Sequence, residues 1–284
     1  MQSARTFRRI IVTGCLCALA VCFPDCGVPY ESTLEDPAVL KPAEAQMERG
    51  LVWMFPGLVG APWELGPAYR GLRDAGLKQA VRFYQWDIPA PNFTAHLERY
   101  SDNVAQAQVV ADDIVAYRRA HRDATIDLVG YSAGGFFALM VAGALPPDVR
   151  LRNIVLAQPD VSPTFDLTPA LEHVDGQLVN FYSPDEWMLS GLFTMVMGTM
   201  DRQYVASAGK SGFNLAEAVP DPALRDKVVP VRWSAAMNAV GISANHLVIL
   251  DYAWNKDFVA PYVVDPEDLV VTGPPGAADA ATSN

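Results

Sequence analysis

Cysteine is almost absent from this sequence of 284 residues. All four cysteines lie before residue 27, at Cys15, Cys17, Cys22 and Cys26. The rest of the chain therefore has no internal disulfide framework, and its stability must come from a hydrophobic core. A single domain of this length buries about 75% of the surface that its unfolded chain exposes. The length is thus sufficient for folding without covalent cross-links.

Positive charge is also scarce. The chain has 21 lysines and arginines against 32 acidic residues, which gives a net charge of −11. Affinity for nucleic acids comes largely from basic side chains that displace counterions from the phosphate backbone. The charge balance therefore argues against a nucleic-acid partner. With 51% hydrophobic and 19% charged residues, the composition is that of an ordinary globular protein.

The N-terminal apolar run, at positions 10–23, is too short to cross a bilayer as a mature helix. Arginines precede it and Pro24 ends it, which is typical of an export signal. We predict an export signal over residues 1–26 and a periplasmic or extracellular location. The segment is similar to bacterial lipoprotein signals at Val12–Cys15 and Leu19–Cys22, which leaves a lipid-anchored, membrane-associated protein open. Ala18-Leu19-Ala20 instead predicts plain cleavage.

The remaining chain divides into a predicted linker at 27–48, one domain at 49–264 and a disordered tail at 265–284. The domain holds short apolar runs without strict alternation, as expected for parallel strands buried on both faces. These runs are 51–55, 80–86, 125–129, 153–157, 178–182 and 228–233. Helical patterns lie between them at 64–74, 101–121 and 133–145. The alternation predicts a three-layer α/β fold.

One motif points to chemistry: Gly130-Tyr131-Ser132-Ala133-Gly134 has the G-x-S-x-G pattern. It follows a predicted strand and opens a predicted helix, which is the context of a nucleophile elbow. The flanking glycines are needed because the turn is strained and its backbone passes close to itself. Ser132 is therefore the predicted nucleophile, at the carboxyl end of the sheet and above a helix N-terminus that favours negative charge.

With this motif in this context, the sequence resembles the α/β-hydrolase superfamily, specifically its serine esterases and lipases, over about residues 50–264. The resemblance implies an eight-stranded, mostly parallel sheet with helices on both faces and the chain order serine, acid, histidine. Only about twenty residues separate the runs at 153–157 and 178–182. We therefore expect little or no cap domain.

A serine hydroxyl needs an imidazole to take its proton and a carboxylate to orient that imidazole. The chain has four histidines, and His246 follows the final predicted strand, so it is the predicted base. For the acid we predict Asp185, in the turn after the run at 178–182. Asp160, one strand earlier, is the main alternative, and Glu186 is a further one.

Two backbone N–H groups are the predicted oxyanion hole: that of Ala133, after the nucleophile, and that of Leu58. Leu58 belongs to Phe55-Pro56-Gly57-Leu58, where Pro56-Gly57 replaces the His-Gly that members of the superfamily usually carry. The predicted substrate-binding residues are Tyr131, Trp187 and Met188. The methionine-rich segment 187–200 is suited either to lining an acyl pocket or to core packing.

These features predict a serine ester hydrolase without metal or cofactor, acting on short-to-medium acyl chains of a small ester through an acyl-enzyme on Ser132. Thioesters and amides use the same residues, so a thioesterase or peptidase remains an alternative. A non-catalytic exported binding protein that keeps the fold is the alternative from another class. The sequence does not predict an oligomeric state.

Overall fold

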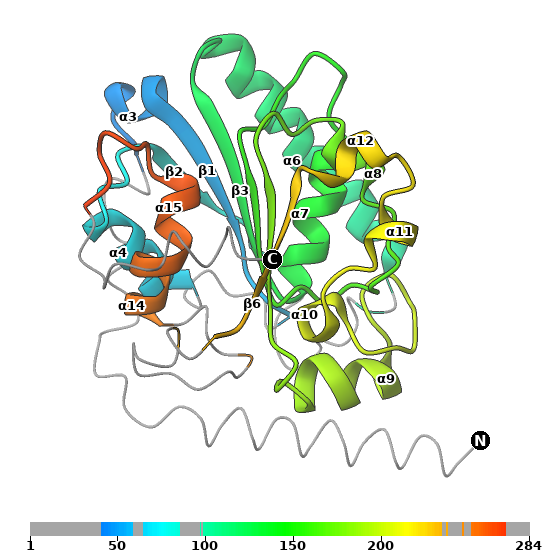
Figure 1. Cartoon of the computed structure of the whole chain (residues 1–284). Coiled ribbons are helices and arrows are strands. Elements are labelled where there is room, and N and C mark those ends of the chain that lie inside the picture. The colour runs from blue at the N-terminus through cyan, green and yellow to red at the C-terminus, as the bar shows by residue number, and fades with distance from the viewer. Residues whose placement is uncertain are drawn as a thin grey trace.

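A parallel β-sheet forms the centre of the computed structural model, which describes residues 41–58, 65–85, 97, 99–234, 237, 246 and 251–270, without the Met188 side chain. Within these residues the sheet has six strands, all parallel, in the order β2-β1-β3-β4-β5-β6 (Figure 1). They are β1 (Gly50–Phe55), β2 (Ala80–Phe83), β3 (Thr125–Tyr131), β4 (Ile154–Ala157), β5 (Leu178–Tyr182) and β6 (Val228–Arg232). All six predicted strands are confirmed. The prediction for β2 ran three residues too far, and β3 continues to Tyr131.

The sheet is buried on both faces, as its continuous apolar strands predict. In β1, Leu51, Trp53 and Phe55 belong to one core cluster, whereas Val52 and Met54 belong to another. This alternation follows from the two-residue period of a strand, which sends successive side chains to opposite faces. Each face therefore needs its own cover of helices.

The helices on one face are α6 (Tyr100–Ala120), α7 (Ala133–Gly143) and α8 (Thr168–Leu171). The other face is covered by α4 (Gly66–Asp74), α14 (Tyr252–Trp254), the π-helical turn η4 (Asn255–Val259) and α15 (Ala260–Val263). Figure 1 shows the two groups on opposite sides of the strands. The predicted helices at 64–74, 101–121 and 133–145 are confirmed as α4, α6 and α7. None of the described helices is both long and apolar enough to cross a bilayer.

The connection from β5 to β6 holds the π-helical turn η2 (Met188–Phe193), α9 (Thr194–Met197), α10 (Ala208–Ser211), α11 (Leu215–Ala218) and α12 (Pro222–Arg225). Figure 1 shows α9 and α10 at the end of the sheet where the strands finish. Together η2 and α9 contribute only ten residues, from Met188 to Met197. The expectation of little or no cap domain stays a prediction, because parts of the predicted domain lie outside the described residues.

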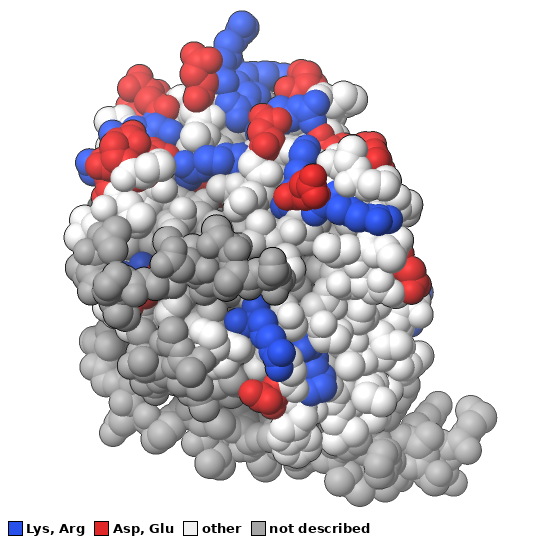
Figure 2. Space-filling model, in the orientation of Figure 1, with Lys and Arg blue, Asp and Glu red and all other residues white. Residues whose placement is uncertain are grey.

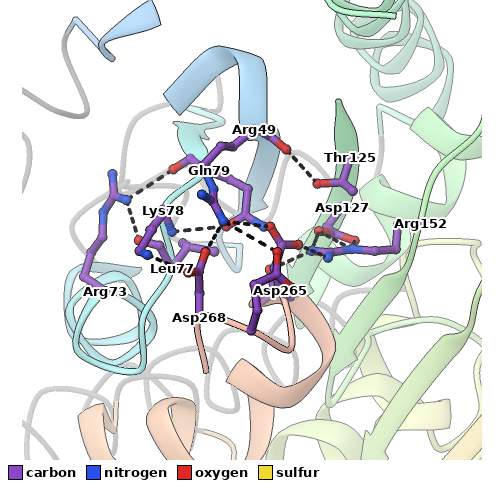
Figure 3. Close-up of polar contacts among 12 residues, drawn as sticks. Arg49, Arg73, Leu77, Lys78, Gln79, Thr125, Asp127, Arg152, Asp265 and Asp268 are labelled. Carbon is purple, nitrogen blue, oxygen red and sulfur yellow. Dashed lines mark hydrogen bonds and ion pairs between the residues drawn. The ribbon is translucent and has the colours of Figure 1, made fainter. Parts of the chain in front are cut away.

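The predicted domain boundaries need correction at both ends. The end of the predicted linker forms the helix α3 (Glu44–Arg49), which leads directly into β1. Residues 265–270, expected in the disordered tail, are packed on the domain: Asp268 pairs with Arg49 and lies 2.5 Å from Lys78 (Figure 3). These ion pairs order both segments together. The predicted export signal, the possible lipidation sites, most of the linker and the tail after 270 lie outside the described residues.

A second ion-pair network ties the same C-terminal segment to the sheet. Arg152 forms ion pairs with the fully buried Asp127 of β3 and with Asp265 (Figure 3). Burial raises the pKa of Asp127 to about 6, although the Arg152 guanidinium and the Asn153 backbone N–H favour its charged form. This network lies near the amino ends of the strands, at the opposite edge of the sheet from the predicted nucleophile.

Candidate active site

Ser132 occupies the single-residue turn between β3 and α7. Its backbone has φ 52° and ψ −120°, a left-handed conformation that costs a residue with a side chain about 1–3 kcal/mol. This turn places Ser132 at the carboxyl edge of the sheet, at the N-terminus of a helix of eleven residues. This is the predicted nucleophile elbow.

The two glycines of the motif allow this turn by their lack of a side chain. A Cβ on Gly130 would lie 2.5 Å from the carbonyl oxygen of Gly134. A Cβ on Gly134 would lie 2.2 Å from the carbonyl oxygen of Phe55, at the end of β1. Both distances are below any real contact, so the spacing of the motif reflects close packing of three backbone segments.

His246 reaches Ser132 from 114 residues further along the chain. Its Nε2 lies 2.8 Å from Ser132 Oγ, and both side chains are buried. The structure therefore brings the predicted nucleophile and the predicted base within hydrogen-bond distance. In this arrangement the hydroxyl donates to Nε2, which leaves the ring proton on Nδ1.

Tyr131 lies against the imidazole of His246. Its ring centroid lies 5.2 Å from that of His246, and its hydroxyl donates a hydrogen bond to the backbone carbonyl of His246. The side chain is buried. The predicted contact between Tyr131 and substrate stays a prediction, and the structure adds that this residue packs against the histidine and hydrogen-bonds its backbone.

The acid facing His246 is Glu186, whereas the predicted Asp185 is exposed. Glu186 Oε2 lies 3.8 Å from His246 Nδ1, and only 6% of Glu186 is exposed. The reason is local: its carboxylate accepts backbone hydrogen bonds from Leu189, at 3.1 Å, and from Ser190 at the start of η2. These donors turn the Glu186 carboxylate inward, toward His246. Glu186, the further alternative named from the sequence, therefore has the position that the acid requires.

Ser190 is a member of the site that sequence reasoning missed. Its Oγ lies 3.1 Å from His246 Nδ1, closer than the carboxylate of Glu186. It belongs to η2, the turn that follows Glu186. Ser190 thus contacts His246 through its hydroxyl and Glu186 through its backbone N–H, and the four residues Ser132, His246, Ser190 and Glu186 form one polar cluster.

The charges in this chain favour a neutral histidine beside an ionised glutamate. Burial lowers the pKa of His246, and the Glu186 carboxylate offsets only part of that effect. Burial also raises the pKa of Glu186, but the charge of His246 and hydrogen bonds from Ser190 and Leu189 outweigh it and hold the pKa below its usual range. Neutral imidazole is the form that accepts a proton.

Asp160, the other predicted acid, lies near the elbow but does not face His246. Its backbone N–H donates to the carbonyl oxygen of Ser132 at 2.9 Å, and its side chain is buried. Its Oδ1 has no hydrogen-bond partner within the described part of the chain. Burial, with a further contribution from the charge of Asp201, raises the pKa of Asp160 to about 8. The carboxyl group is therefore protonated at neutral pH.

Replacing Asp160 with asparagine is expected to remove a pH dependence of stability. The folded state keeps a proton that the unfolded state releases above its usual pKa near 3.8, so wild-type stability decreases as pH rises from about 4 to about 8. The slope from this group is at most about 1.4 kcal/mol per pH unit. Urea unfolding of both proteins across this range measures it, and a constant difference between the two would contradict the assignment.

The predicted oxyanion donors come from two adjoining segments. Ala133 is the first residue of α7, so its N–H has no acceptor within that helix. Leu58 follows β1, whose last carbonyl oxygen packs against Gly134. The fold therefore brings Phe55 and Pro56 against the elbow, and Leu58 follows two residues after Pro56.

Apolar side chains are exposed on the short helical segment beside the histidine. Trp187 is 62% exposed, and Leu192 and Met195 are also exposed. Figure 2 shows few charged side chains over the part of this face around α9 and α10, whereas they gather near the amino ends of the strands. Trp187 is thus available to a ligand, while the side chain of Met188 lies outside the described residues.

Two further histidines have other surroundings. The Nδ1 of the buried His173 lies 3.1 Å from the carbonyl oxygen of Val149. His121 lies at the end of α6 and stacks on Tyr117. One acidic group in the described chain has spacing suited to a metal, namely Asp265, Glu267 and Asp268, but Arg49 pairs with all three.

Helices flank the parallel sheet, and the serine on the strand–turn–helix is followed in chain order by an acid and a histidine. Together these features define the α/β-hydrolase fold. Similar solved structures include LpqC, a poly(3-hydroxybutyrate) depolymerase from Bordetella parapertussis, with 14% identity and a TM-score of 0.45 over 71% of this chain and 76% of the depolymerase. Lipase B of Aspergillus fumigatus has 12% identity and a TM-score of 0.47 over 85% of this chain and 58% of the lipase. No protein-family model and no curated protein matches the sequence.

Proposed function

We propose that this protein is a serine hydrolase that cleaves carboxylic esters through an acyl-enzyme on Ser132. The observation that carries the proposal is the distance of 2.8 Å between Ser132 Oγ and His246 Nε2 at a strained elbow. A serine on an ordinary turn needs neither the strain nor the histidine. An ionised buried glutamate on the far side of the imidazole completes the set of groups that activates a serine hydroxyl.

The chemistry proceeds in two halves. His246 takes the proton of Ser132 as Oγ attacks the ester carbonyl carbon, and the negative charge develops on the carbonyl oxygen near the N–H groups of Ala133 and Leu58. The imidazolium then gives its proton to the departing alkoxide, which leaves as an alcohol. Water, deprotonated by the same histidine, attacks the acyl-enzyme and releases the acid and Ser132.

We propose short-to-medium acyl chains as the substrate class. The exposed apolar side chains of Trp187, Leu192 and Met195 stand on the segment that also carries Ser190, beside His246. Apolar surface at the site favours an acyl group over a charged ligand.

A fluorophosphonate probe, which reacts with activated serines, tests the proposal. We expect covalent labelling of the folded protein and mapping of the adduct to Ser132 by mass spectrometry, with no labelling after heat denaturation. Folded protein that stays unlabelled would support the binding-protein alternative. A panel of p-nitrophenyl acetate, butyrate, octanoate and palmitate, with a matched thioester and amide, then defines the substrate. A rate that keeps rising from octanoate to palmitate would contradict the acyl-length proposal.

The acidic limb of the pH–rate profile should lie below the ordinary histidine pKa of 6.5. Only neutral His246 accepts the serine proton, so kcat/KM decreases as pH falls through its pKa, and burial lowers that pKa. The measurement is kcat/KM for p-nitrophenyl butyrate between about pH 4 and about pH 8. A limb centred above 6.5 would show that the imidazolium is stabilised more than the geometry indicates.

A further inference from the structure

We propose that Ser190 connects Glu186 to His246, so that the acid acts on the base through a serine hydroxyl. This inference rests on the proposed function. The distance from His246 Nδ1 to Glu186 Oε2 is 3.8 Å, which exceeds hydrogen-bond length. The distance from Nδ1 to Ser190 Oγ is 3.1 Å. Ser190 Oγ is therefore the nearer of the two oxygens to Nδ1, and the backbone N–H of the same residue donates to the Glu186 carboxylate.

The hydrogen-bonding capacity of a hydroxyl fits this route. When Nε2 accepts a hydrogen bond from the Ser132 hydroxyl, the ring hydrogen is on Nδ1, which must then donate it to another group. Ser190 Oγ can accept that hydrogen and still donate its own toward the Glu186 carboxylate, whose Oε2 already accepts the Ser190 backbone N–H. The ionised carboxylate is an acceptor only, so every group in the chain has a consistent role.

The backbone holds Ser190 firmly at this point. Its N–H donates to Glu186 Oε2, and its carbonyl oxygen accepts from the Ser207 N–H at 2.8 Å and from Thr194 Oγ1 at 2.9 Å. The residue is 1% exposed. These contacts come from Glu186, from α9 and from the N-cap residue of α10, so three segments hold the backbone that carries the hydroxyl. Ser190 is therefore a positioning residue.

No proton has to leave Ser190 during the reaction. When His246 takes the proton of Ser132, the imidazolium carries hydrogen on both nitrogens. Its Nδ1–H still donates to Ser190 Oγ, and the Ser190 hydroxyl still donates to the Glu186 carboxylate. The hydroxyl becomes more polarised as positive charge develops on the ring, which transmits the stabilising charge of Glu186 to the imidazolium.

Kinetics of Ser190→Ala test the connection. We expect kcat to fall by about tenfold to thirtyfold with KM nearly unchanged, because the loss concerns the developing imidazolium and not substrate binding. The acidic limb of the pH profile should also shift to lower pH, because the imidazolium loses stabilisation. Ser207→Ala is the matched control: this serine is also buried, its hydroxyl has no partner among the described residues, and its variant should stay within about twofold of wild type.

Two further measurements keep the inference testable if the alanine variant folds poorly. Ser190→Cys keeps the side-chain volume but hydrogen-bonds weakly, so it should lose rate in the same direction. In proton NMR, the low-field Nδ1–H signal of His246 should move in Ser190→Ala and in Glu186→Gln but not in Ser207→Ala. A signal that moves only in Glu186→Gln, or wild-type kcat and pH profile in Ser190→Ala, would overturn the connection.

The two proposals fail in different ways. Wild-type protein that is folded but unlabelled by the fluorophosphonate, and inactive on every ester, rejects the proposed function. The NMR signal does not depend on turnover, so it reports on the contact between Ser190 and His246 whatever the activity. Labelling of wild type together with an unmoved signal in Ser190→Ala rejects the role of Ser190 alone.

Discussion

Replacing Ser132 with alanine is expected to lower kcat/KM for a p-nitrophenyl ester by about 10⁶, the scale of losing the nucleophile in a serine-hydrolase triad. The change removes the atom that forms the acyl-enzyme, while His246 and the backbone N–H of Ala133 remain. The loss is measured from initial rates at enzyme concentrations for which the enzymatic rate exceeds the rate of background hydrolysis. Labelling by the fluorophosphonate should disappear together with the activity.

The alanine variant should fold like wild type, because alanine has the same Cβ at this strained backbone position and the Ser132 side chain gives no cap to α7. Circular dichroism and thermal unfolding check this. Ser211→Ala, at an exposed serine of α10, is the control and should keep wild-type activity. Activity retained within about tenfold in Ser132→Ala would remove the basis for an acyl-enzyme at this residue.

The second large effect concerns the two adjacent acids. Glu186→Gln is expected to lower kcat/KM by about 10³ to 10⁴, because a neutral amide no longer stabilises the imidazolium or fixes its tautomer. Asp185→Asn changes an exposed carboxylate one residue away and should stay within about twofold. We compare kcat/KM of the two variants on the same ester. In each variant one carboxylate is replaced by an amide, so the two differ only in which acid is changed.

A larger loss of kcat/KM in Asp185→Asn than in Glu186→Gln would restore Asp185 as the acid. It would also imply that the turn is rearranged. Asp160→Asn gives a third arm, since its protonated carboxyl has no contact with His246 and an amide closely matches its shape. We expect it to keep most of the activity. A loss comparable to that of Glu186→Gln would instead assign Asp160 a part in the reaction.

The strands and the elbow could be predicted from the sequence because each signal has a local cause. The run from Ile126 to Val129 is apolar apart from Asp127, because β3 is buried on both faces. The glycines at 130 and 134 are required because any Cβ there meets backbone atoms. Both causes act within a few residues, so the pattern could be interpreted without knowledge of the fold.

The acid could not be chosen from the sequence, because Asp185 and Glu186 occupy the same turn and differ only in direction. The direction is set by the N–H groups of Leu189 and Ser190, which attract the Glu186 carboxylate at the start of η2. A π-helical turn has no sequence signature comparable to a G-x-S-x-G motif. Ser190 escaped notice for the same reason, since its role depends on contact with a residue 56 positions away.

The ion pairs of Arg49 and Lys78 with Asp268 hold the beginning and the end of the described domain side by side. Thr125 and Gly50 are register partners at this same edge, whereas Ser132 lies at the far ends of the strands. A short peptide could therefore join the two ends of the described domain, near residues 41 and 270, without reaching across the face that carries Ser132. The exposed turn at Arg122 and Asp123 then offers a place for new termini, so the domain is suited to circular permutation with its reaction centre left intact.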